Sequence, residues 1–510
     1  MKQTRGKRRL IQISELVLLF IVIAITAGRA PAQSLDQFEK RLTKFTLDNG
    51  LKFLVLERHE APVVSFHIYA DVGAVDEVKG ITGIAHILEH MAFKGTRTIG
   101  SKDWQAETKA MSQVDEIFEQ IKAELRKGEQ ADESRLKELN EQLKAAEENA
   151  EQYIVHDQFD EIYTEAGGAG LNASTSWDAT RYIISLPANK VELWMWMESD
   201  RFLEPVLREF YKERKVIMEE RRLRTESDPV GRLLEDFIAV AYKAHPYGEP
   251  IIGHMSDIET ITRSEVNAFF RKYYCPGNLT MAIVGDVDPQ QIREMAERYF
   301  GRIPGGQAPD PVETVEPPQT GQRRVEEEDP AQPFVLIGYH KPSIHHKDNA
   351  VFDAITDIVG MGRTSRLFES LVKEKRVAVY ASGFQGLPGN KYPGLFLFYA
   401  VPARGHSNEE CEDAIYVEIE RLKSELVSEQ ELEKAKTRAR ASLIRSLASN
   451  SGLASKLAFY EAMTGDWRNL FKDLDSIEQV TVEDIQRIAK EYFTTTNRTV
   501  GVIKTVQAKN

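Results

Sequence analysis

The chain has 510 residues, of which 42% are hydrophobic and 28% are charged, so it is long enough for two or more domains with their own cores. The formal net charge of −13 argues against nucleic acid as a partner. The two cysteines, Cys275 and Cys411, lie far apart in the sequence and cannot form a disulfide framework, so stability must come from packing.

Residues 1–32 have the pattern of a secretory signal peptide. A basic start that includes Arg8 and Arg9 precedes an apolar run over 16–27, and small residues end at Ala32. The pattern predicts cleavage after Ala32 and a secreted or periplasmic protein without a stable membrane span; removal of the segment changes the formal net charge to −18. The alternative is an uncleaved N-terminal membrane anchor, although the apolar run is shorter than the ~20 residues that a transmembrane helix needs.

Residues 37–302 are expected to form the first of two mixed α and β halves. Short strands are predicted at 45–47 and 51–56, joined by an Asp-Asn-Gly turn at 48–50. Alternating apolar residues predict a further strand over 63–72, before a glycine-punctuated loop.

A helix that is expected to begin near Thr82 carries the most informative motif, His-x-x-Glu-His. His86 and His90 are four residues apart, so on a helix both imidazoles can bind one metal ion, and Glu89 points into the same space. Zinc acidifies a bound water and a nearby carboxylate can take its proton, so the motif predicts an inverted-motif zinc peptidase site. Apolar flanking residues predict that the helix is buried, where two histidines and a glutamate need a functional reason.

Residues from about 104 to 162 are rich in Glu, Lys, Gln and Ala, and their apolar residues keep a helical spacing interrupted near Gly128. The pattern predicts a helical hairpin. Charge-rich helix pairs usually form a solvated face or an arm that contacts another protein, so we expect no direct catalytic role. We also expect the hairpin to loop out, because long surface insertions cost little closure entropy. Zinc binding is then expected to survive removal of roughly 115–149.

Two predicted strand segments follow, one around 171–175 and one at 181–186. A later helical region contains Glu213, Glu219 and Glu220 at helical spacing. Zinc held by two histidines usually takes one more protein ligand, and a glutamate is a common third ligand. This acidic helix is therefore a candidate source of the third ligand, but the spacing does not choose among the three glutamates.

Residues 303–331, rich in proline and glycine, predict a linker to a second half at 332–510. Without gaps, 257–284 aligns with 476–503 at an offset of 219 and gives six identities. The sequence therefore predicts an α+β fold of two homologous α/β-sandwich halves, with the helical hairpin inserted in the first.

The repeat also predicts that the two halves have different tasks. Near the start of each half, Pro62 falls on Pro333, an offset of 271. The same offset places His86–His90 over Asp357–Met361, where the apolar positions largely persist and the metal ligands do not. We expect the second half to serve another purpose, such as closing over a substrate.

Together these motifs resemble the pitrilysin or insulinase-like family of zinc peptidases, most closely its short branch, which includes mitochondrial processing peptidase subunits and bacterial relatives. The resemblance covers essentially the whole mature chain. It implies that Glu220 is the third zinc ligand and that Glu213, two helical turns earlier, supports catalysis. Besides the metal motif, the resemblance rests on the segments 48–51, 171–175, 213–220, 245–248 and 284–286.

The resemblance also implies how substrate is bound. The strand around Asn172 and Ala173 would offer its backbone edge to an extended peptide. Tyr380 matches a tyrosine by which the second half reaches the substrate carbonyl or its oxyanion. The usual partner of that tyrosine is an arginine, and Lys373 at this position keeps the charge but loses the bidentate fork.

The implied activity is that of a zinc endopeptidase with one Zn²⁺ per chain, acting on peptides or unfolded polypeptides in extended form. His86, His90 and Glu220 would hold zinc, and Glu89 would be the general base and then the proton donor. Long members of the family enclose a chamber with four such domains, so a second chain, either another copy or a related subunit, is expected to form a dimer with this one. The alternative is a binding or assembly subunit whose turnover depends on a partner chain.

Overall fold

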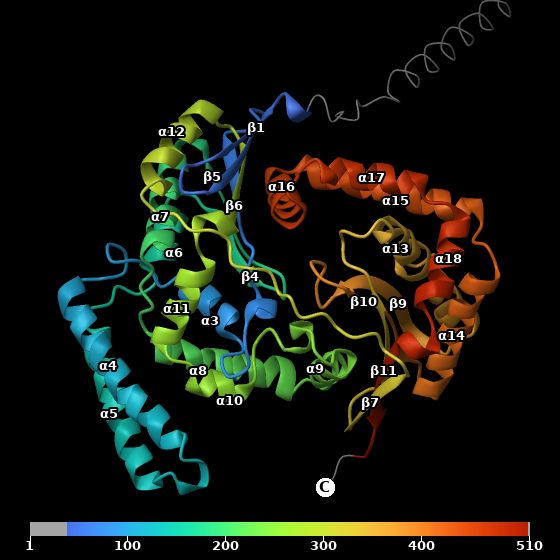
Figure 1. Ribbon diagram of the computed structural model, residues 1–510, viewed down its shortest axis with the longest axis horizontal. Helices are drawn as coiled ribbons and strands as arrows, with labels where there is room; N and C mark the ends of the chain where they lie inside the picture. Colours follow the sequence, from blue (N-terminus) through green and yellow to red (C-terminus); the bar gives the residue numbers. More distant parts are fainter. Residues whose placement is uncertain (1–37, 508–510) are drawn as a thin grey trace, which may run out of the picture. The chain divides into compact units, whose positions relative to one another are not determined.

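The computed structural model describes residues 38–507, so the predicted signal segment lies outside the described residues. Residues 44–507 belong to one compact unit, in which helices pack against two sheets (Figure 1). The strands are β1 (Leu42–Thr46), β2 (Lys52–Glu57), β3 (Val63–Ala70), β4 (Ala169–Thr175), β5 (Thr180–Pro187), β6 (Leu279–Gly285), β7 (Arg323–Asp329), β8 (Phe334–Lys341), β9 (Ala378–Leu387), β10 (Gly394–Pro402) and β11 (Arg498–Thr505). The helices are α3 (Ile84–Met91), α4 (Trp104–Leu125), α5 (Glu133–Glu151), α6 (Gln158–Glu165), α7 (Val191–Leu203), α8 (Phe210–Arg221), α9 (Pro229–Ala241), α10 (Met255–Thr260), α11 (Arg263–Tyr273), α12 (Pro289–Phe300), α13 (Asn349–Ile355), α14 (Asn408–Ser424), α15 (Glu429–Ala448), α16 (Asn450–Thr464), α17 (Asn469–Gln479) and α18 (Val482–Tyr492).

The first sheet has the order β1-β2-β6-β3-β5-β4, and the second has the order β7-β11-β8-β10-β9. In the first sheet β6 is buried along its whole length, because it pairs with β2 on one side and β3 on the other. Strand β4, at the end of the order, has alternating exposure. The apolar cores of the two halves are separate clusters, one built on each sheet.

The predicted repeat is confirmed by the positions of equivalent elements. Strands β3 and β8 begin and end 271 residues apart, while α11 and α18, and likewise β6 and β11, begin 219 residues apart. Both repeated helices start with a capping box, formed by Thr262 with Glu265 and by Thr481 with Asp484. The α+β fold with two similar halves is therefore the observed architecture.

Each half contributes a helix to the sheet of the other half. Helix α9 of the first half packs on β7 and β11, and α16 of the second half packs on β3 and β6. Phe237 of α9 is fully buried, and the strands approach it at glycines. A Cβ atom at Gly338 would lie 2.7 Å from the Phe237 ring, and one at Gly501 would lie 3.0 Å from it. The exchanged helices join the two halves through packed apolar surface.

Part of the predicted linker is a strand. Strand β7 lies within 303–331 and pairs in parallel with β11 at the edge of the second sheet. Its sequence, Arg-Arg-Val-Glu-Glu-Glu-Asp, gives partly buried and exposed positions in alternation. A charged sequence of this kind is common on edge strands, where one side faces water, and it gives no apolar signal in the sequence.

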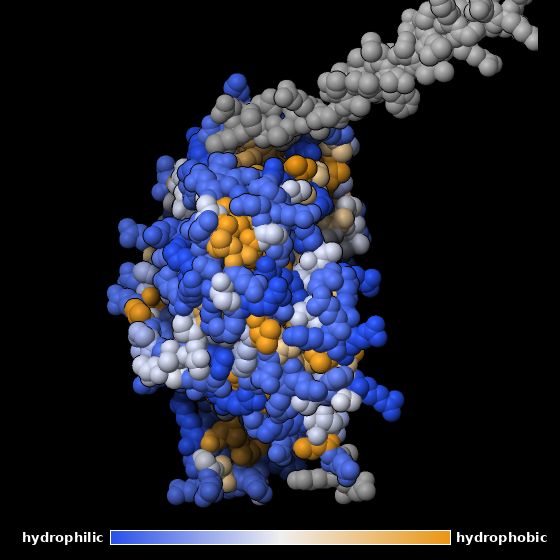
Figure 2. Space-filling model, turned by 90° about the vertical axis from the view of Figure 1, so that its right-hand side faces the viewer, coloured by the Kyte–Doolittle hydropathy of each residue, from blue (hydrophilic) through white to orange (hydrophobic). Residues whose placement is uncertain are grey.

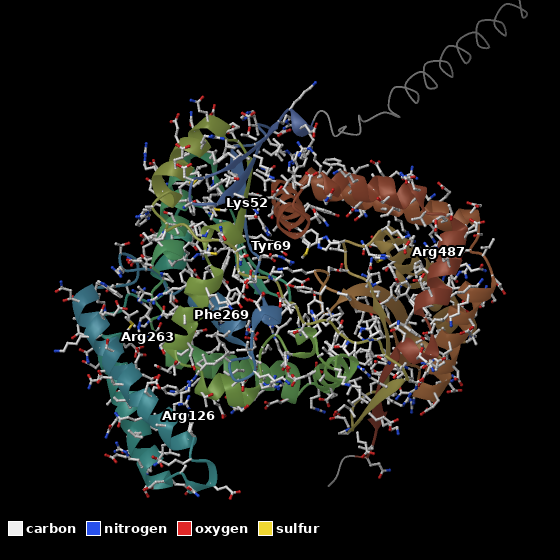
Figure 3. All side chains as sticks on the ribbon, in the orientation of Figure 1. Lys52, Tyr69, Arg126, Arg263, Phe269 and Arg487 are labelled. Carbon is white, nitrogen blue, oxygen red and sulfur yellow. The ribbon has the colours of Figure 1, made fainter. Side chains whose placement is uncertain are left out.

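The predicted helical hairpin is formed by α4 and α5, which lie side by side and are called the arm here (Figure 1). Asp103 and Asp132 cap the two helices, each accepting two backbone hydrogen bonds. The arm does not simply loop out into solvent. Phe118 and Leu139 are buried in the core cluster of the first half. Arg263 of α11, which is labelled in Figure 3, forms an ion pair with Asp115 of α4.

The face drawn in Figure 2 is mainly hydrophilic, with a few separate hydrophobic patches. Among residues 38–507, no helix combines the length and the apolar character that crossing a bilayer requires.

Candidate metal centre

Helix α3, which carries the His-x-x-Glu-His motif, has a closely fixed start. Gly83 has a positive φ of 88°, and a Cβ atom there would lie 2.2 Å from the carbonyl oxygen of Ile252. The buried carboxylate of Glu77 accepts hydrogen bonds from the backbone nitrogens of Gly83 (2.7 Å) and Ala85 (2.8 Å). Burial raises the pKa of Glu77, while these donors favour its charged form at the helix N-terminus. The apolar face of α3 is buried through Ile84, Ile87, Leu88 and Met91.

The side chains of His86, His90 and Glu220 converge although the third comes from α8. Oε2 of Glu220 lies 3.7 Å from Nε2 of His86 and 3.4 Å from Nε2 of His90. Atoms that bind one zinc tetrahedrally at ~2.0–2.2 Å lie roughly 3.3–3.6 Å apart. The separation of 3.4 Å falls in this range and that of 3.7 Å lies just above it, so the three donors are close to the spacing that one zinc ion requires. Burial lowers the pKa of His86 to about 3, which keeps its imidazole in the neutral form that binds metals.

Glu213 orients one of these histidines. Its Oε1 lies 3.0 Å from Nδ1 of His90, and its Oε2 lies 2.8 Å from Nζ of Lys94. Burial raises the pKa of Glu213, but the hydrogen bonds with His90 and Lys94 outweigh this effect and lower it to about 2. An ionised carboxylate only accepts, so Nδ1 of His90 is the donor and its Nε2 lone pair faces Glu220 and His86.

Burial lowers the pKa of His90, but the hydrogen bond with Glu213 and the negative charges of Glu213, Glu220 and Glu89 together outweigh burial, so the net shift of this pKa is upward. Because a histidine binds metal through a deprotonated ring nitrogen, a proton and a zinc ion would compete for Nε2 of His90.

Glu89 is tied to the edge strand of the first sheet. Its Oε2 accepts a hydrogen bond of 2.6 Å from Oγ1 of Thr175, the last residue of β4. Burial raises the pKa of Glu89, which suits a group that takes up a proton and returns it. Asn172 and Ala173 lie on the same strand and pair with β5, so the opposite edge of β4 is at the end of the sheet.

The two predicted site residues of the second half, Tyr380 and Lys373, contact other residues of that half. Tyr380 is on β9, 45% exposed, with its ring 5.7 Å from that of Tyr399. Lys373 forms an ion pair of 2.6 Å with Glu369 one helical turn earlier. Among the described residues, no hydrogen bond or ion pair joins Tyr380 or Lys373 to His86, His90 or Glu220.

The position that is equivalent to the motif in the second half has no comparable set of ligands. There Asp357 forms an ion pair of 2.7 Å with Arg438 of α15. The chain around it forms a π-helical turn, Thr356–Gly360. The ion pair neutralises the single carboxylate that replaces the first histidine.

Three residues at the site were not among the predicted site residues: Glu77, Lys94 and Thr175. Thr175 belongs to the segment 171–175, on which the resemblance partly rests. Because side chains alternate between the two faces of a strand, its position on the strand could have suggested contact with Glu89. Glu77 and Lys94 lie in loops on either side of α3, where no periodic pattern indicates the direction of a side chain. Their contacts depend on the tertiary fold.

Two family models match this chain. The model described as Insulinase (Peptidase family M16) matches residues 52–115 and 148–254, and the model described as Peptidase M16 inactive domain matches 260–439. The first match omits 116–147, which is the outer part of the arm.

Similar proteins span nearly the whole chain. The zinc protease PqqE of Helicobacter pylori is 30% identical over 507 residues, covering 96% of this chain and 99% of that protein. The crystal structure of a protease from Helicobacter pylori aligns with a TM-score of 0.76 at 29% identity, covering 91% of this chain and 99% of that one. The periplasmic protease PqqL from Escherichia coli has a similar fold, with a TM-score of 0.68 at 17% identity; the alignment covers 92% of this chain and 48% of that one. From the family models and the whole-length relatives we conclude that this chain belongs to the insulinase family of peptidases, M16.

Proposed function

We propose that the protein is a zinc-dependent endopeptidase that cleaves peptides or unfolded polypeptides bound in extended form. The observation that carries this proposal is the convergence of His86, His90 and Glu220 beside Glu89, with interatomic spacings that suit one zinc ion. Homologues named zinc proteases support a metallopeptidase in general.

Each polar residue of the site has a defined task in the proposed reaction. His86, His90 and Glu220 would hold one zinc ion, which supplies acidification of water and polarisation of the scissile carbonyl when bound. Glu89 takes the proton of the attacking water and returns it to the leaving amine. Thr175 keeps the Glu89 carboxylate in place, and Glu213 fixes the tautomer of the second histidine.

The free edge of β4 is the proposed platform for substrate. Its backbone groups at Asn172 and Ala173 can pair with an extended peptide as an added strand, next to the carboxylate that Thr175 holds. Backbone pairing selects conformation more than side-chain identity, so unfolded segments fit best. We keep Tyr380 and Lys373 as proposed substrate contacts from the second half; Lys373 would have to leave its ion pair with Glu369.

A partner chain is also part of the proposal. This chain has two halves, and a second copy or a related subunit would complete an enclosure around the substrate. The second candidate function, a subunit whose turnover depends on a partner, is favoured by the match of 260–439 to a model described as inactive. His86, His90 and Glu220 lie outside that match, in the first half. Their position favours the peptidase. A secreted or periplasmic location follows from the predicted signal segment.

Cleavage mapping tests the proposed function. The zinc-loaded chain without its predicted signal segment is incubated with unstructured peptides and with a folded protein of similar sequence content, and the products are identified by mass spectrometry. We expect internal cuts in the unstructured peptides and none in the folded protein, because only an extended backbone can pair with β4. Cuts confined to the chain ends would contradict an endopeptidase. Silence from a folded, zinc-bound sample would favour the partner-dependent subunit, and the oligomeric state of the same sample would direct the search for its partner.

A further inference from the structure

A connected set of ion pairs extends from the metal centre toward the arm. Glu213 uses one carboxylate oxygen for His90 and the other for Nζ of Lys94, at 2.8 Å. The same Nζ lies 3.5 Å from Oε2 of Glu209, the residue that precedes α8. The side chain of Lys94 is 23% exposed, so this contact is partly shielded from water. Lys94 therefore contacts both Glu213, which orients the proposed ligand His90, and Glu209, at the start of the helix that carries the proposed ligand Glu220.

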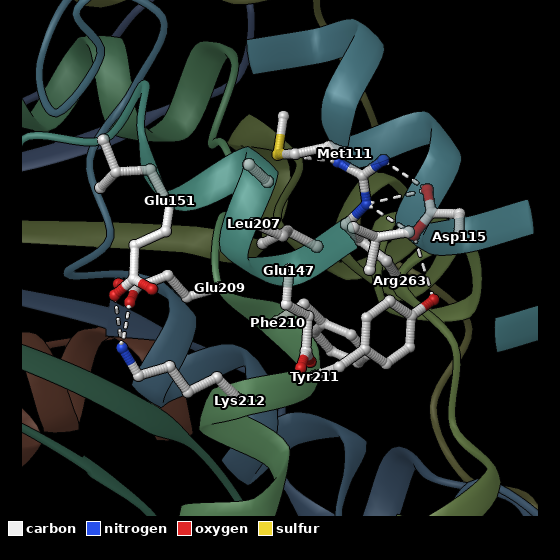
Figure 4. A pocket seen from close by; sticks show the side chains of 13 residues that line it. Met111, Asp115, Glu147, Glu151, Leu207, Glu209, Phe210, Tyr211, Lys212 and Arg263 are labelled. Carbon is white, nitrogen blue, oxygen red and sulfur yellow. Dashed lines mark hydrogen bonds and ion pairs between the residues drawn. The ribbon is translucent and has the colours of Figure 1, made fainter. Parts of the chain in front are cut away.

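Glu209 in turn is linked to the end of the arm through Lys212. Its Oε1 lies 2.9 Å from Nζ of Lys212, and the same Nζ lies 3.1 Å from Oε1 of Glu151, the last residue of α5 (Figure 4). Oε1 of Glu209 also lies 3.6 Å from Nδ1 of His156. Glu151, His156 and Glu209 have metal-binding side chains, but the ammonium of Lys212 contacts both carboxylates, so we interpret the group as an ion-pair cluster. Glu209 also has a positive φ of 55°, which is unfavourable for a residue with a side chain and persists where the surroundings enforce it.

The backbone of Lys94 is held by the arm as well. The guanidinium of Arg208, fully buried, donates to the carbonyl oxygens of Lys94, Thr96 (2.8 Å) and Ile99 (3.0 Å). Its Nε donates to Oε1 of Glu107, in the first turn of α4, at 2.7 Å. The arm thus reaches Lys94 by two routes, through its side chain and through its backbone.

The first turns of α8 are attached to the arm on a second side. Oδ1 of Asp115 accepts from the hydroxyl of Tyr211 at 3.0 Å, and the same carboxylate pairs with Arg263. Figure 4 shows this group and the Lys212 cluster on opposite sides of a cavity of ≈ 50 Å³. Further out, the ring of Phe118 lies 4.4 Å from that of Tyr211 and 4.1 Å from the guanidinium of Arg214. The arm therefore fixes the N-terminal part of the helix that carries Glu213 and Glu220.

We propose that Lys94 is a positioning residue of the metal centre, and that the arm sets its position through Glu209 and Arg208. The inference rests on the proposed zinc site. The Lys94 ammonium fixes the second oxygen of Glu213, so that the first stays on Nδ1 of His90. Without it, the Glu213 carboxylate can rotate away from the histidine, and the repulsion among the neighbouring carboxylates increases.

The test measures the zinc affinity of variants by competition with a chromophoric chelator, without any substrate. Lys94→Met removes the charge at similar length, and Lys94→Arg keeps the charge. Glu209→Gln removes the carboxylate charge that lies between Lys94 and Lys212 and so weakens the side-chain link to the arm. Lys122→Met is the matched control, because Lys122 pairs the arm with Glu265 of α11 at 2.8 Å and no hydrogen bond or ion pair of the described residues joins either side chain to Lys94, Glu213 or His90. Circular dichroism and thermal melting establish that each variant is folded.

Lys94→Met is expected to bind zinc about tenfold more weakly, and Glu209→Gln about threefold more weakly, since loss of a residue that supports a ligand typically costs 10–100-fold in metal affinity. Lys94→Arg should recover most of the affinity. Lys122→Met should melt at a lower temperature with unchanged zinc affinity. Unchanged zinc affinity in Lys94→Met and Glu209→Gln, or a loss of zinc affinity in Lys122→Met equal to that in Lys94→Met, would overturn this inference and leave the proposed function standing. A wild-type chain that does not bind zinc would instead overturn the proposed function.

Discussion

Glu89→Gln should lower the rate of peptide hydrolysis about 10²–10⁴-fold and leave zinc bound, because glutamine keeps the size of the side chain and cannot take a proton. Its amide can still interact with the Thr175 hydroxyl, which now donates to Glu89 at 2.6 Å. None of the three proposed ligands is changed. The measurement is hydrolysis of a quenched peptide together with the zinc content of the same sample.

Glu219→Gln provides the matched control for this substitution. Glu219 precedes the proposed ligand Glu220 on α8, but its side chain is 64% exposed and pairs with Arg222. Its replacement should change the hydrolysis rate less than about twofold, because an exposed ion pair contributes little. If Glu89→Gln kept a tenth or more of the wild-type rate, or lost its zinc, Glu89 would not be the general base.

Arg208→Met should destabilise the protein by about 3–5 kcal/mol, the largest loss of stability that we expect from a single substitution at the base of the arm. The Arg208 guanidinium is 1% exposed and the carboxylate of Glu107 is fully buried. Removal of the guanidinium leaves a buried charge without its partner and three backbone carbonyls without this donor. Urea unfolding should show a lower midpoint with an unchanged dependence on urea concentration.

The control for Arg208→Met is Arg97→Met, because Arg97 pairs with Glu204 at 2.8 Å where both side chains are about half exposed. That substitution should leave the midpoint almost unchanged. The double variant Glu107→Gln with Arg208→Met should be more stable than Arg208→Met alone, since it no longer buries an unpaired charge. Equal midpoints for wild type and Arg208→Met would show that the buried pair does not anchor the arm.

Much of the fold could be predicted because its signals are local or periodic. The four-residue spacing of His86 and His90 indicates one helical face, and the bounds of α11 and α18 agree with the offset of 219 that the sequence suggested. Spacing could not separate Glu213, Glu219 and Glu220, because all three belong to the same short helix. The structure places Glu213 and Glu220 toward the histidines and Glu219 toward solvent.

The attachment of the arm could not be predicted in the same way. Its contacts join residues that are far apart in the sequence, such as Phe118 with Tyr211 and Glu107 with Arg208. Such contacts cannot be identified in a charge-rich sequence, because the sequence pattern does not distinguish an anchoring side chain from an ordinary surface charge or a residue of the helix core. The expectation that zinc binding survives removal of the arm is not supported by these contacts. Removal of 116–147 should weaken zinc binding, because Phe118 packs on α8, the helix that carries Glu213 and Glu220.

The most direct test of the central claim is a zinc titration of the metal-free chain, with bound zinc and peptide hydrolysis measured on the same samples. If His86, His90 and Glu220 form the active site, hydrolysis should rise in proportion to bound zinc and level off at one zinc per chain. Hydrolysis that is unchanged by metal removal, or that is absent from a folded chain with one zinc bound, would contradict a self-sufficient zinc peptidase.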